Sequence, residues 1–210
     1  MLIPFEVIIK THNIKPTGVL HVGANTGQEA GAYYKNGIEK SIWIEAIPSI
    51  FEQLKNNISL YKNAIAFNEC VSDVDGQVVE FKITNNNGES SSMLELGRHK
   101  EFYPQVCVIE RISCVTKRID TIILENKIDM SEYDFLTMDL QGAELLALKG
   151  MTDNLHKVNF VYLEVNKDEL YTNCARVEQL DAFLLEYKFK RLQTYWTGNN
   201  WGDAYYGREL

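Results

Sequence analysis

The chain has 210 residues, of which 45% are hydrophobic, and its formal net charge is −8. This length suits a single domain over residues 1–210 with a sizeable core. The acidic balance excludes the basic surface that displaces counterions from nucleic acids, so we expect no nucleic-acid partner.

Membrane insertion and secretion find no support in the sequence. No run of about 20 apolar residues occurs, and the N-terminus lacks the basic start and cleavage site of a secretory signal. The cysteines Cys70, Cys107, Cys114 and Cys174 show no C-x-x-C spacing, which favours reduced core thiols over zinc ligands or disulfides. We therefore expect a cytoplasmic protein without a membrane span.

Hydrophobic periodicity predicts an N-terminal helix followed by alternating strands and helices. The first helix is expected within residues 1–16, where Pro16 ends it. Strands are predicted at 18–23, 40–45, 64–72, 78–81, 105–115, 133–139 and 159–165, and helices at 27–36, 49–57, 142–149 and 174–187. Two last strands, at 188–195 and 203–208, are expected to form an antiparallel ending.

This alternation predicts an α/β, Rossmann-like fold. Its sheet should be mostly parallel, with helices on both faces and an antiparallel C-terminal strand. In such sheets, ligands bind beyond the carboxyl ends of the strands. The segment at 85–104 opens with an Asn-rich and Ser-rich run and is expected to be a loop insertion over that site.

The most informative stretch is an apolar run that ends in Gly23, followed four residues later by Gly27. Glycine tolerates positive φ and lets the backbone turn tightly beside a ligand. Glu45 ends the next apolar run, where an acid in nucleotide-binding folds accepts hydrogen bonds from a ribose. Asn25 and Gln28 occupy positions where a dinucleotide fingerprint needs glycine. The pattern therefore indicates a nucleoside cofactor that is not bound through a pyrophosphate.

Three predicted strands end in an acid, namely Glu45, Asp139 and Glu164. Because the carboxyl ends of parallel strands meet at one edge of the sheet, these acids are expected to lie there together. Capping of the following helix is the alternative for Asp139. Glu45 is not placed as a cap, so capping does not account for all three acids.

The string from Asp134 to Glu144 is an apolar strand ending in Asp-x-x-Gly-x-Glu, and it closely resembles the second signature of FkbM-type methyltransferases. The turn from Gly23 to Gly27 resembles the first motif of S-adenosylmethionine-dependent methyltransferases. Further matching segments lie at 45–48, 70–73, 90–94, 118–122 and 161–165. The resemblance spans residues 17–166 and implies a class I methyltransferase that methylates a hydroxyl, often of a sugar or a glycosylated natural product.

The resemblance also implies which residues bind S-adenosylmethionine: Gly23, Ala24, Asn25, Thr26, Gly27, Glu45, Ala46, Ser72 and Asp139. Thr137 and Gln141 depart from the family pattern, because many members have lysine and glutamate there. A lysine base is therefore not available at that place. His21 replaces a common aspartate and is expected to be a core residue rather than a catalytic one.

Transfer of a methyl group to a hydroxyl needs positioning and a way to weaken or remove the hydroxyl proton. Asp139 and Glu164 are the candidate catalytic bases. A divalent cation would be the other device, and Asp139, Glu164 and Asn166 offer the oxygen ligands that Mg²⁺ or Mn²⁺ takes. The sequence leaves both devices open.

Aromatic and polar residues gather between Tyr195 and Tyr206. Trp201 beside asparagine and aspartate would suit a sugar face with its hydroxyl rim, so we expect a glycan or another small molecule as acceptor. Ordinary core packing is the alternative for these aromatics. Two other functions stay open: an NAD-dependent sugar oxidoreductase, against which Asn25 and Gln28 argue, and a non-catalytic glycan-binding protein on a methyltransferase fold.

Overall fold

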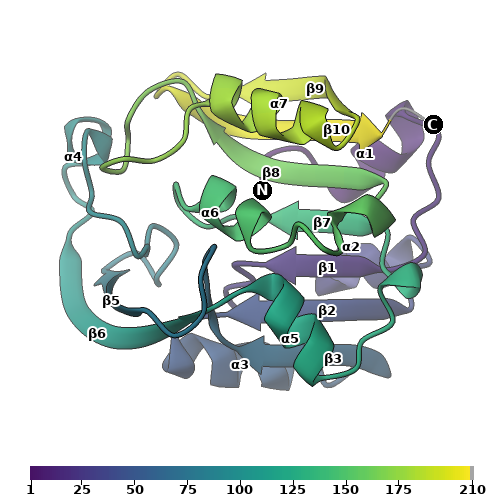
Figure 1. Cartoon of the computed structure of the whole chain (residues 1–210). Coiled ribbons are helices and arrows are strands. Elements are labelled where there is room, and N and C mark those ends of the chain that lie inside the picture. The colour runs from purple at the N-terminus through teal and green to yellow at the C-terminus, as the bar shows by residue number, and fades with distance from the viewer. Residues whose placement is uncertain (209–210) are drawn as a thin grey trace.

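The computed structural model describes residues 1–208, and its central feature is a seven-stranded sheet (Figure 1). The strand order is β3-β2-β1-β7-β8-β10-β9. The strands are β1 (Val19–Val22), β2 (Lys40–Glu45), β3 (Asn63–Asn68), β7 (Phe135–Met138), β8 (Phe160–Asn166), β9 (Phe189–Trp196) and β10 (Trp201–Arg208). β10 runs antiparallel to both of its neighbours, whereas β3, β2, β1, β7 and β8 pair in parallel. The predicted mostly parallel sheet with an antiparallel C-terminal strand is confirmed.

Helices cover both faces of this sheet (Figure 1). One face carries α1 (Phe5–Thr11), α2 (Ala30–Lys35) and α3 (Pro48–Ile58), and the other carries α5 (Ile119–Glu125), α6 (Glu144–Lys149) and α7 (Val177–Glu186). Shorter helical segments are α4 (His99–Phe102) and the 3₁₀ turns Met130–Glu132 and Leu155–Lys157. Within residues 1–208, no helix combines the length and the hydrophobicity needed to cross a bilayer.

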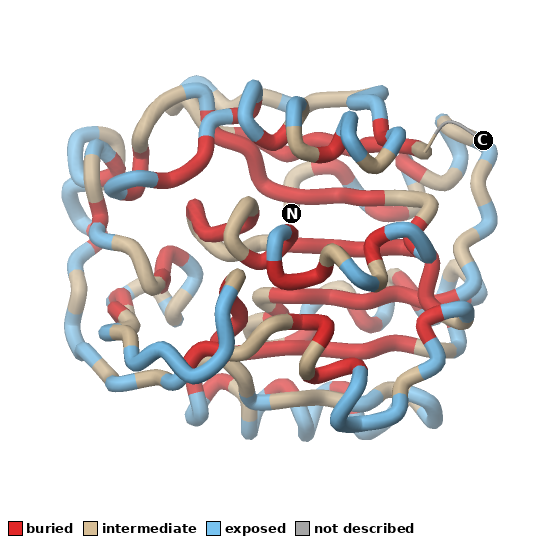
Figure 2. The backbone as a smooth tube through the Cα atoms, in the orientation of Figure 1, coloured by how far each residue is buried: buried red, intermediate tan, exposed pale blue. Residues whose placement is uncertain are grey.

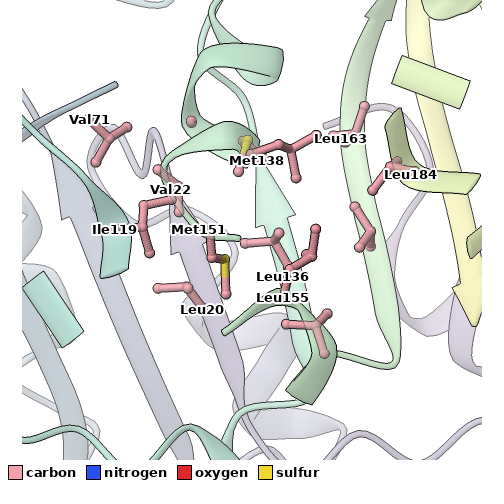
Figure 3. Close-up of a cluster of buried hydrophobic side chains, with 14 of the residues drawn as sticks. Leu20, Val22, Val71, Ile119, Leu136, Met138, Met151, Leu155, Leu163 and Leu184 are labelled. Carbon is pink, nitrogen blue, oxygen red and sulfur yellow. The ribbon is translucent and has the colours of Figure 1, made fainter. Parts of the chain in front are cut away.

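The central strands β1 and β7 are buried along their whole length, as Figure 2 shows. Their side chains alternate between the two faces, so Leu20, Val22, Leu136 and Met138 pack together beneath Ile119 of α5 (Figure 3). Continuous apolar runs are expected where helices cover both faces of a parallel sheet. This packing fixes the carboxyl ends of β1 and β7 side by side.

A second, three-stranded sheet has the order β4-β6-β5, with β4 at Cys70–Val71, β5 at Val78–Thr84 and β6 at Val108–Lys117. β5, β6 and α4 lie beyond the carboxyl ends of the parallel strands (Figure 1). The prediction of one strand over 64–72 is wrong. That segment divides after Asn68, whose side-chain nitrogen donates to the carbonyls of Glu45 (2.8 Å) and Ala46 (3.1 Å). The next residues pair with β6 instead.

Helix starts differ from the prediction where the backbone adopts positive φ. Asn25 (45°) and Gly27 (78°) precede α2, which starts at residue 30 rather than 27. Gln141 (52°) and Gly142 (98°) precede α6 in the same way. Residues in that region cannot continue a right-handed helix. The sequence did not predict α4 and α5.

The cysteines lie in different environments. Cys70 and Cys174 are buried and Cys114 is partly buried, whereas Cys107 is exposed. The prediction of core thiols is therefore wrong for Cys107, which precedes the first residue of β6.

Candidate functional site

The turn after β1 joins the ends of three strands. The backbone N–H groups of Gly23 and Ala24 donate to the carbonyl of Ile44 in β2 (2.9 and 3.0 Å). Gly23 has φ of 78°, and a Cβ atom there would lie 1.8 Å from the carbonyl oxygen of Asp139. A Cβ on Gly27 would lie 2.8 Å from Leu54 in α3. Packing against the backbone thus requires glycine at position 23, and the positive φ of 78° at both positions favours glycine in this turn.

Glu45 lies directly against this turn. Its side chain is 7% exposed, and its two carboxylate oxygens accept from the backbone N–H groups of Asn25 and Ile47, both at 2.8 Å. Burial raises the pKa of Glu45, while these two hydrogen bonds act in the opposite direction. Asn25 also accepts from Thr26 N–H (2.7 Å) and donates to the carbonyl of Asn87 (3.3 Å). Glu45 therefore fixes the turn through its hydrogen bond from Asn25, and the Asn25 side chain links the turn to Asn87 in the 85–104 segment.

A cavity of about 680 Å³ opens beside Glu45, a size typical of small-molecule sites. Predicted cofactor residues that line it are Gly23, Ala24, Asn25, Glu45, Ala46 and Asp139. Thr26, Gly27 and Ser72 lie outside its lining; the Ser72 hydroxyl donates to Asp73 (3.1 Å). The 85–104 segment supplies a wall through residues that include Asn86, Ser90, Ser91, Met93, His99 and Tyr103.

Three buried or partly buried carboxylates meet at the ends of β7 and β8. Oxygens of Asp139, Glu144 and Glu164 all lie within 4.8 Å of one another. The Gln141 amide nitrogen donates to Asp139 Oδ1 (2.6 Å) and to Glu164 Oε2 (2.8 Å), and its oxygen accepts from the Tyr171 hydroxyl. Glu144 accepts from the backbone N–H groups of residues 140 (2.8 Å) and 142 (3.2 Å).

Burial is the main cause of the raised pKa values in this cluster. It raises the pKa of Asp139 to about 6 and that of Glu144 to about 7. The pKa of Glu164 lies well above its usual range because of burial and the nearby charge of Asp139. Acids with raised pKa values can accept or hold a proton near neutral pH, which is the property required of a general base.

Asn166, predicted as a metal ligand, lies outside the cavity lining, whereas Glu144, which was not predicted, belongs to the carboxylate cluster. Asn166 ends β8 and is 1% exposed, and neither its amide nitrogen nor its oxygen has a hydrogen-bond partner within residues 1–208. Glu144 was not predicted as a site residue, although it stands inside the signature string. A carboxylate in the first turn of a helix usually signals a cap, which concealed its position beside Asp139 and Glu164.

Of the late aromatic residues, Trp201 lines the cavity. Its indole N–H donates to the Tyr103 hydroxyl (2.8 Å), which also accepts from the Asn199 amide (2.9 Å). Tyr205 and Tyr206 are buried in the core instead, where Tyr206 donates to Asp181 (2.9 Å). Tyr195 is exposed, and Trp196 lies below the ammonium of Lys167 (4.4 Å). Core packing and surface contacts thus account for most of this segment.

His21 borders the cavity but is satisfied inside the protein. Its Nδ1 is 3.0 Å from the Tyr33 hydroxyl, and its ring stacks on Trp43 (4.9 Å between centroids). Burial lowers the pKa of His21 to about 4, so the ring is neutral. Tyr33 also reaches the Thr137 hydroxyl (3.1 Å). These contacts agree with the prediction of a core histidine.

Comparison with known proteins extends this picture. Residues 21–191 match the family described as Methyltransferase FkbM domain. The 2-O-methyltransferase NoeI of Sinorhizobium fredii is 26% identical over 184 residues, covering 82% of this chain and 74% of NoeI.

Solved structures of other methyltransferases share the fold. Magnesium protoporphyrin IX methyltransferase ChlM from Synechocystis PCC 6803 aligns with a TM-score of 0.52 at 7% identity, covering 97% of this chain and 76% of ChlM. Ribosomal protein L11 methylase from Lactobacillus delbrueckii subsp. bulgaricus aligns with a TM-score of 0.52 at 14% identity, covering 98% and 77% of the two chains. At these identities the likeness establishes a Rossmann-like class I methyltransferase fold.

Proposed function

The chain belongs to the family of methyltransferases with an FkbM domain and is an S-adenosylmethionine-dependent methyltransferase, and we propose that it methylates a hydroxyl of a sugar or a glycosylated acceptor. The proposal rests on one observation: the same cavity is lined by residues suited to the cofactor and by residues suited to the acceptor and its chemistry. One wall contains Glu45 and the turn after β1, and the other contains Asp139, Glu164, Tyr103 and Trp201. The relative NoeI, whose name assigns it to 2-O-methylation, supports a hydroxyl acceptor.

The residues of the first wall suit the cofactor. S-adenosylmethionine supplies a methyl group attached to a positively charged sulfur. Each carboxylate oxygen of Glu45 accepts one hydrogen bond from a backbone N–H group, and each can accept a second from a ribose hydroxyl. Asp139 places a carboxylate at the end of β7, where it would attract the positive charge of the cofactor.

We assign the proton transfer to Asp139 and Glu164. Asp139 directly follows β7 and Glu164 lies near the end of the adjacent parallel strand β8, and the Gln141 amide donates to one oxygen of each. Their raised pKa values make them stronger bases than exposed carboxylates. One of them would receive the hydroxyl proton while the acceptor oxygen bonds to the methyl carbon and the bond between that carbon and the sulfur breaks, with S-adenosylhomocysteine as the leaving group. Orientation within the cavity would supply much of the remaining rate enhancement.

A divalent cation is a second device that these residues could support. Asp139, Glu164 and Glu144 offer oxygens within 4.8 Å of one another, and Asn166 offers an amide oxygen without a partner. Such an oxygen-only set fits Mg²⁺ or Mn²⁺, which would stabilise negative charge on the acceptor oxygen. Gln141 now donates to two of these carboxylates, so a bound cation would have to displace its amide.

Two measurements test the proposal. Calorimetry with S-adenosylmethionine, S-adenosylhomocysteine and NAD should show binding of the first two and none of the third. A methyl-transfer assay over a panel of methyl pyranosides should then release S-adenosylhomocysteine in the presence of at least one of them. Binding of NAD would favour an oxidoreductase. Pyranoside binding without turnover or cofactor binding would favour the non-catalytic glycan-binding alternative.

A further inference from the structure

The cavity also holds an imidazole that the proposed chemistry does not use. His99 is the first residue of α4, lines the cavity and is 6% exposed. Its backbone N–H donates to the carbonyl of Leu170 (2.9 Å). The ring centroid lies 4.9 Å from that of Tyr103 and 5.4 Å from that of Tyr171. Backbone and aromatic contacts therefore hold the ring in place.

One nitrogen of this ring has no hydrogen-bond partner among the described residues. Within residues 1–208, Nδ1 of His99 is buried and has no hydrogen-bond partner. Most buried polar atoms are hydrogen-bonded, so an unpartnered nitrogen in the ring of a cavity-lining histidine is a candidate contact for a ligand. Burial lowers the pKa of His99, which favours the neutral form of the ring. A neutral ring with its hydrogen on Nε2 presents a lone pair at Nδ1, and an alcohol hydroxyl can donate to that lone pair.

Tyr103 offers the complementary group. Its hydroxyl oxygen accepts from the Trp201 indole (2.8 Å) and from the Asn199 amide (2.9 Å). The indole nitrogen and the amide nitrogen are both donors, so neither can accept the hydroxyl hydrogen of Tyr103. The Tyr103 O–H hydrogen is therefore left to donate, and Tyr103 lines the same cavity as His99.

The ring of His99 is connected to the carboxylates through Tyr171 and Gln141. Tyr171, which packs against His99, donates its hydroxyl to Gln141. Gln141 in turn donates to Asp139 and Glu164. A molecule bound to His99 would thus lie in the cavity that also contains the proposed base.

We propose that His99 and Tyr103 form an acceptor subsite for two neighbouring hydroxyls of a pyranose ring. His99 Nδ1 accepts from one hydroxyl, Tyr103 donates to the other, and Trp201 borders the sugar. The inference rests on the proposed function and deepens it by naming the part of the acceptor that is recognised. It assigns binding to these residues and leaves the proton transfer to the carboxylates.

The test compares variants with sugar analogues. Methyl pyranosides and their monodeoxy derivatives are titrated by protein-observed NMR into the complex with S-adenosylhomocysteine. In the wild-type protein, loss of one of the two recognised hydroxyls should weaken binding at least tenfold, because an unmatched buried polar group penalises the analogue. In the His99→Phe variant, the parent sugar and the analogue lacking the hydroxyl bound by His99 should bind equally weakly. Tyr103→Phe should remove the discrimination at the other hydroxyl.

Controls separate recognition from folding. Phenylalanine keeps the aromatic packing of His99 and removes the orphaned nitrogen, so the Tm should equal or exceed that of the wild type. His99→Asn restores a polar atom near the position of Nδ1 and should recover part of the discrimination. Tyr34→Phe is the matched tyrosine control, because Tyr34 is 62% exposed and lies outside the cavity lining.

The outcomes are distinguishable from failure of the proposed function. Undiminished discrimination in both His99→Phe and Tyr103→Phe would overturn the subsite while leaving the methyltransferase assignment intact. So would S-adenosylhomocysteine binding with no affinity for any pyranoside that carries adjacent hydroxyls. Absence of S-adenosylhomocysteine binding by the wild-type protein would overturn the cofactor site itself.

Discussion

Replacing Gln141 by glutamate tests whether the hydrogen bonds that its amide donates stabilise the two carboxylates beside it. The substitution preserves shape and the positive φ of 52°, but it exchanges two N–H donors for a carboxylate. The new group would lie at hydrogen-bond distance from Asp139 and Glu164. We therefore expect Gln141→Glu to destabilise the protein in a strongly pH-dependent way.

The magnitude follows from two competing costs. Two unit charges about 4 Å apart repel by about 4 kcal/mol at an effective dielectric constant of 20, so two ionised neighbours would cost about 8 kcal/mol. Keeping the new carboxyl protonated is cheaper. At about 1.36 kcal/mol per pH unit above a reference pKa near 4.3, this costs about 5 kcal/mol at pH 8 and about 1.6 kcal/mol at pH 5.5. The smaller cost sets the expected destabilisation.

The sign follows from proton linkage. A carboxyl whose pKa is raised in the folded state binds more protons folded than unfolded, so its contribution to stability declines as pH rises from the unfolded pKa through the folded pKa. Wild-type Asp139 and Glu144, with pKa values raised to about 6 and about 7, already act in this direction. The variant should extend that decline to higher pH.

Thermal unfolding at pH 5.5 and pH 8, in buffer containing EDTA, measures the effect. With about 2–4 °C of Tm per kcal/mol for a chain of this size, we expect a decrease of about 10–20 °C at pH 8 and about 3–6 °C at pH 5.5. Gln53→Glu is the matched control, because Gln53 is exposed on α3 and its substitution should change stability by less than about 0.5 kcal/mol. Equal Tm decreases at both pH values would refute the argument, since they would show that the cost of the new carboxyl does not depend on its ionisation beside Asp139 and Glu164.

Three further predictions concern ligands. Glu45→Ala should weaken S-adenosylmethionine binding at least tenfold by calorimetry, because hydrogen bonds to a charged group contribute about 1.5–3 kcal/mol each; an unchanged Kd would place the nucleoside elsewhere. Trp201→Ala should raise the acceptor KM about tenfold, since burial of a large side chain contributes about 1.5–3 kcal/mol, and should leave the cofactor Kd unchanged. If the carboxylates hold Mg²⁺ or Mn²⁺, exhaustive EDTA treatment should lower turnover at least tenfold and either ion should restore it, whereas unchanged turnover would exclude a required cation.

The fold was predictable because its determinants are local and repetitive. Apolar runs such as 19–22 and 135–138 are buried on both faces, so each run indicated a central parallel strand. The position of Glu45 beside the turn followed from the same logic, since β1 and β2 pair in register and end together. The break after Asn68 was not predictable from periodicity, because β4 pairs with residues of β6 that lie 46 positions further along the chain.

The less predictable parts of the site depend on long-range contacts. His99 lies in a four-residue helix that carries no apolar periodicity, and its neighbour Tyr171 is 72 positions away. Tyr103 meets Trp201 across a still longer separation. No spacing rule links such pairs, so only the folded chain shows that they share a cavity with Asp139.

The distribution of unsatisfied groups argues against a protein that only binds glycans. Within residues 1–208, Asn166 is one of two residues whose buried side-chain nitrogen or oxygen atoms lack a partner, and it lies at the carboxyl edge of the sheet, at the end of β8. The carboxylates of Asp139, Glu144 and Glu164 lie at the same edge with raised pKa values, which lowers stability near neutral pH. Stacking of a sugar on Trp201 does not require buried carboxylates that lower the stability of the protein near neutral pH. A group-transfer site does require polar atoms held ready for a substrate, so we expect apolar substitutions at these positions to raise stability and lower activity together.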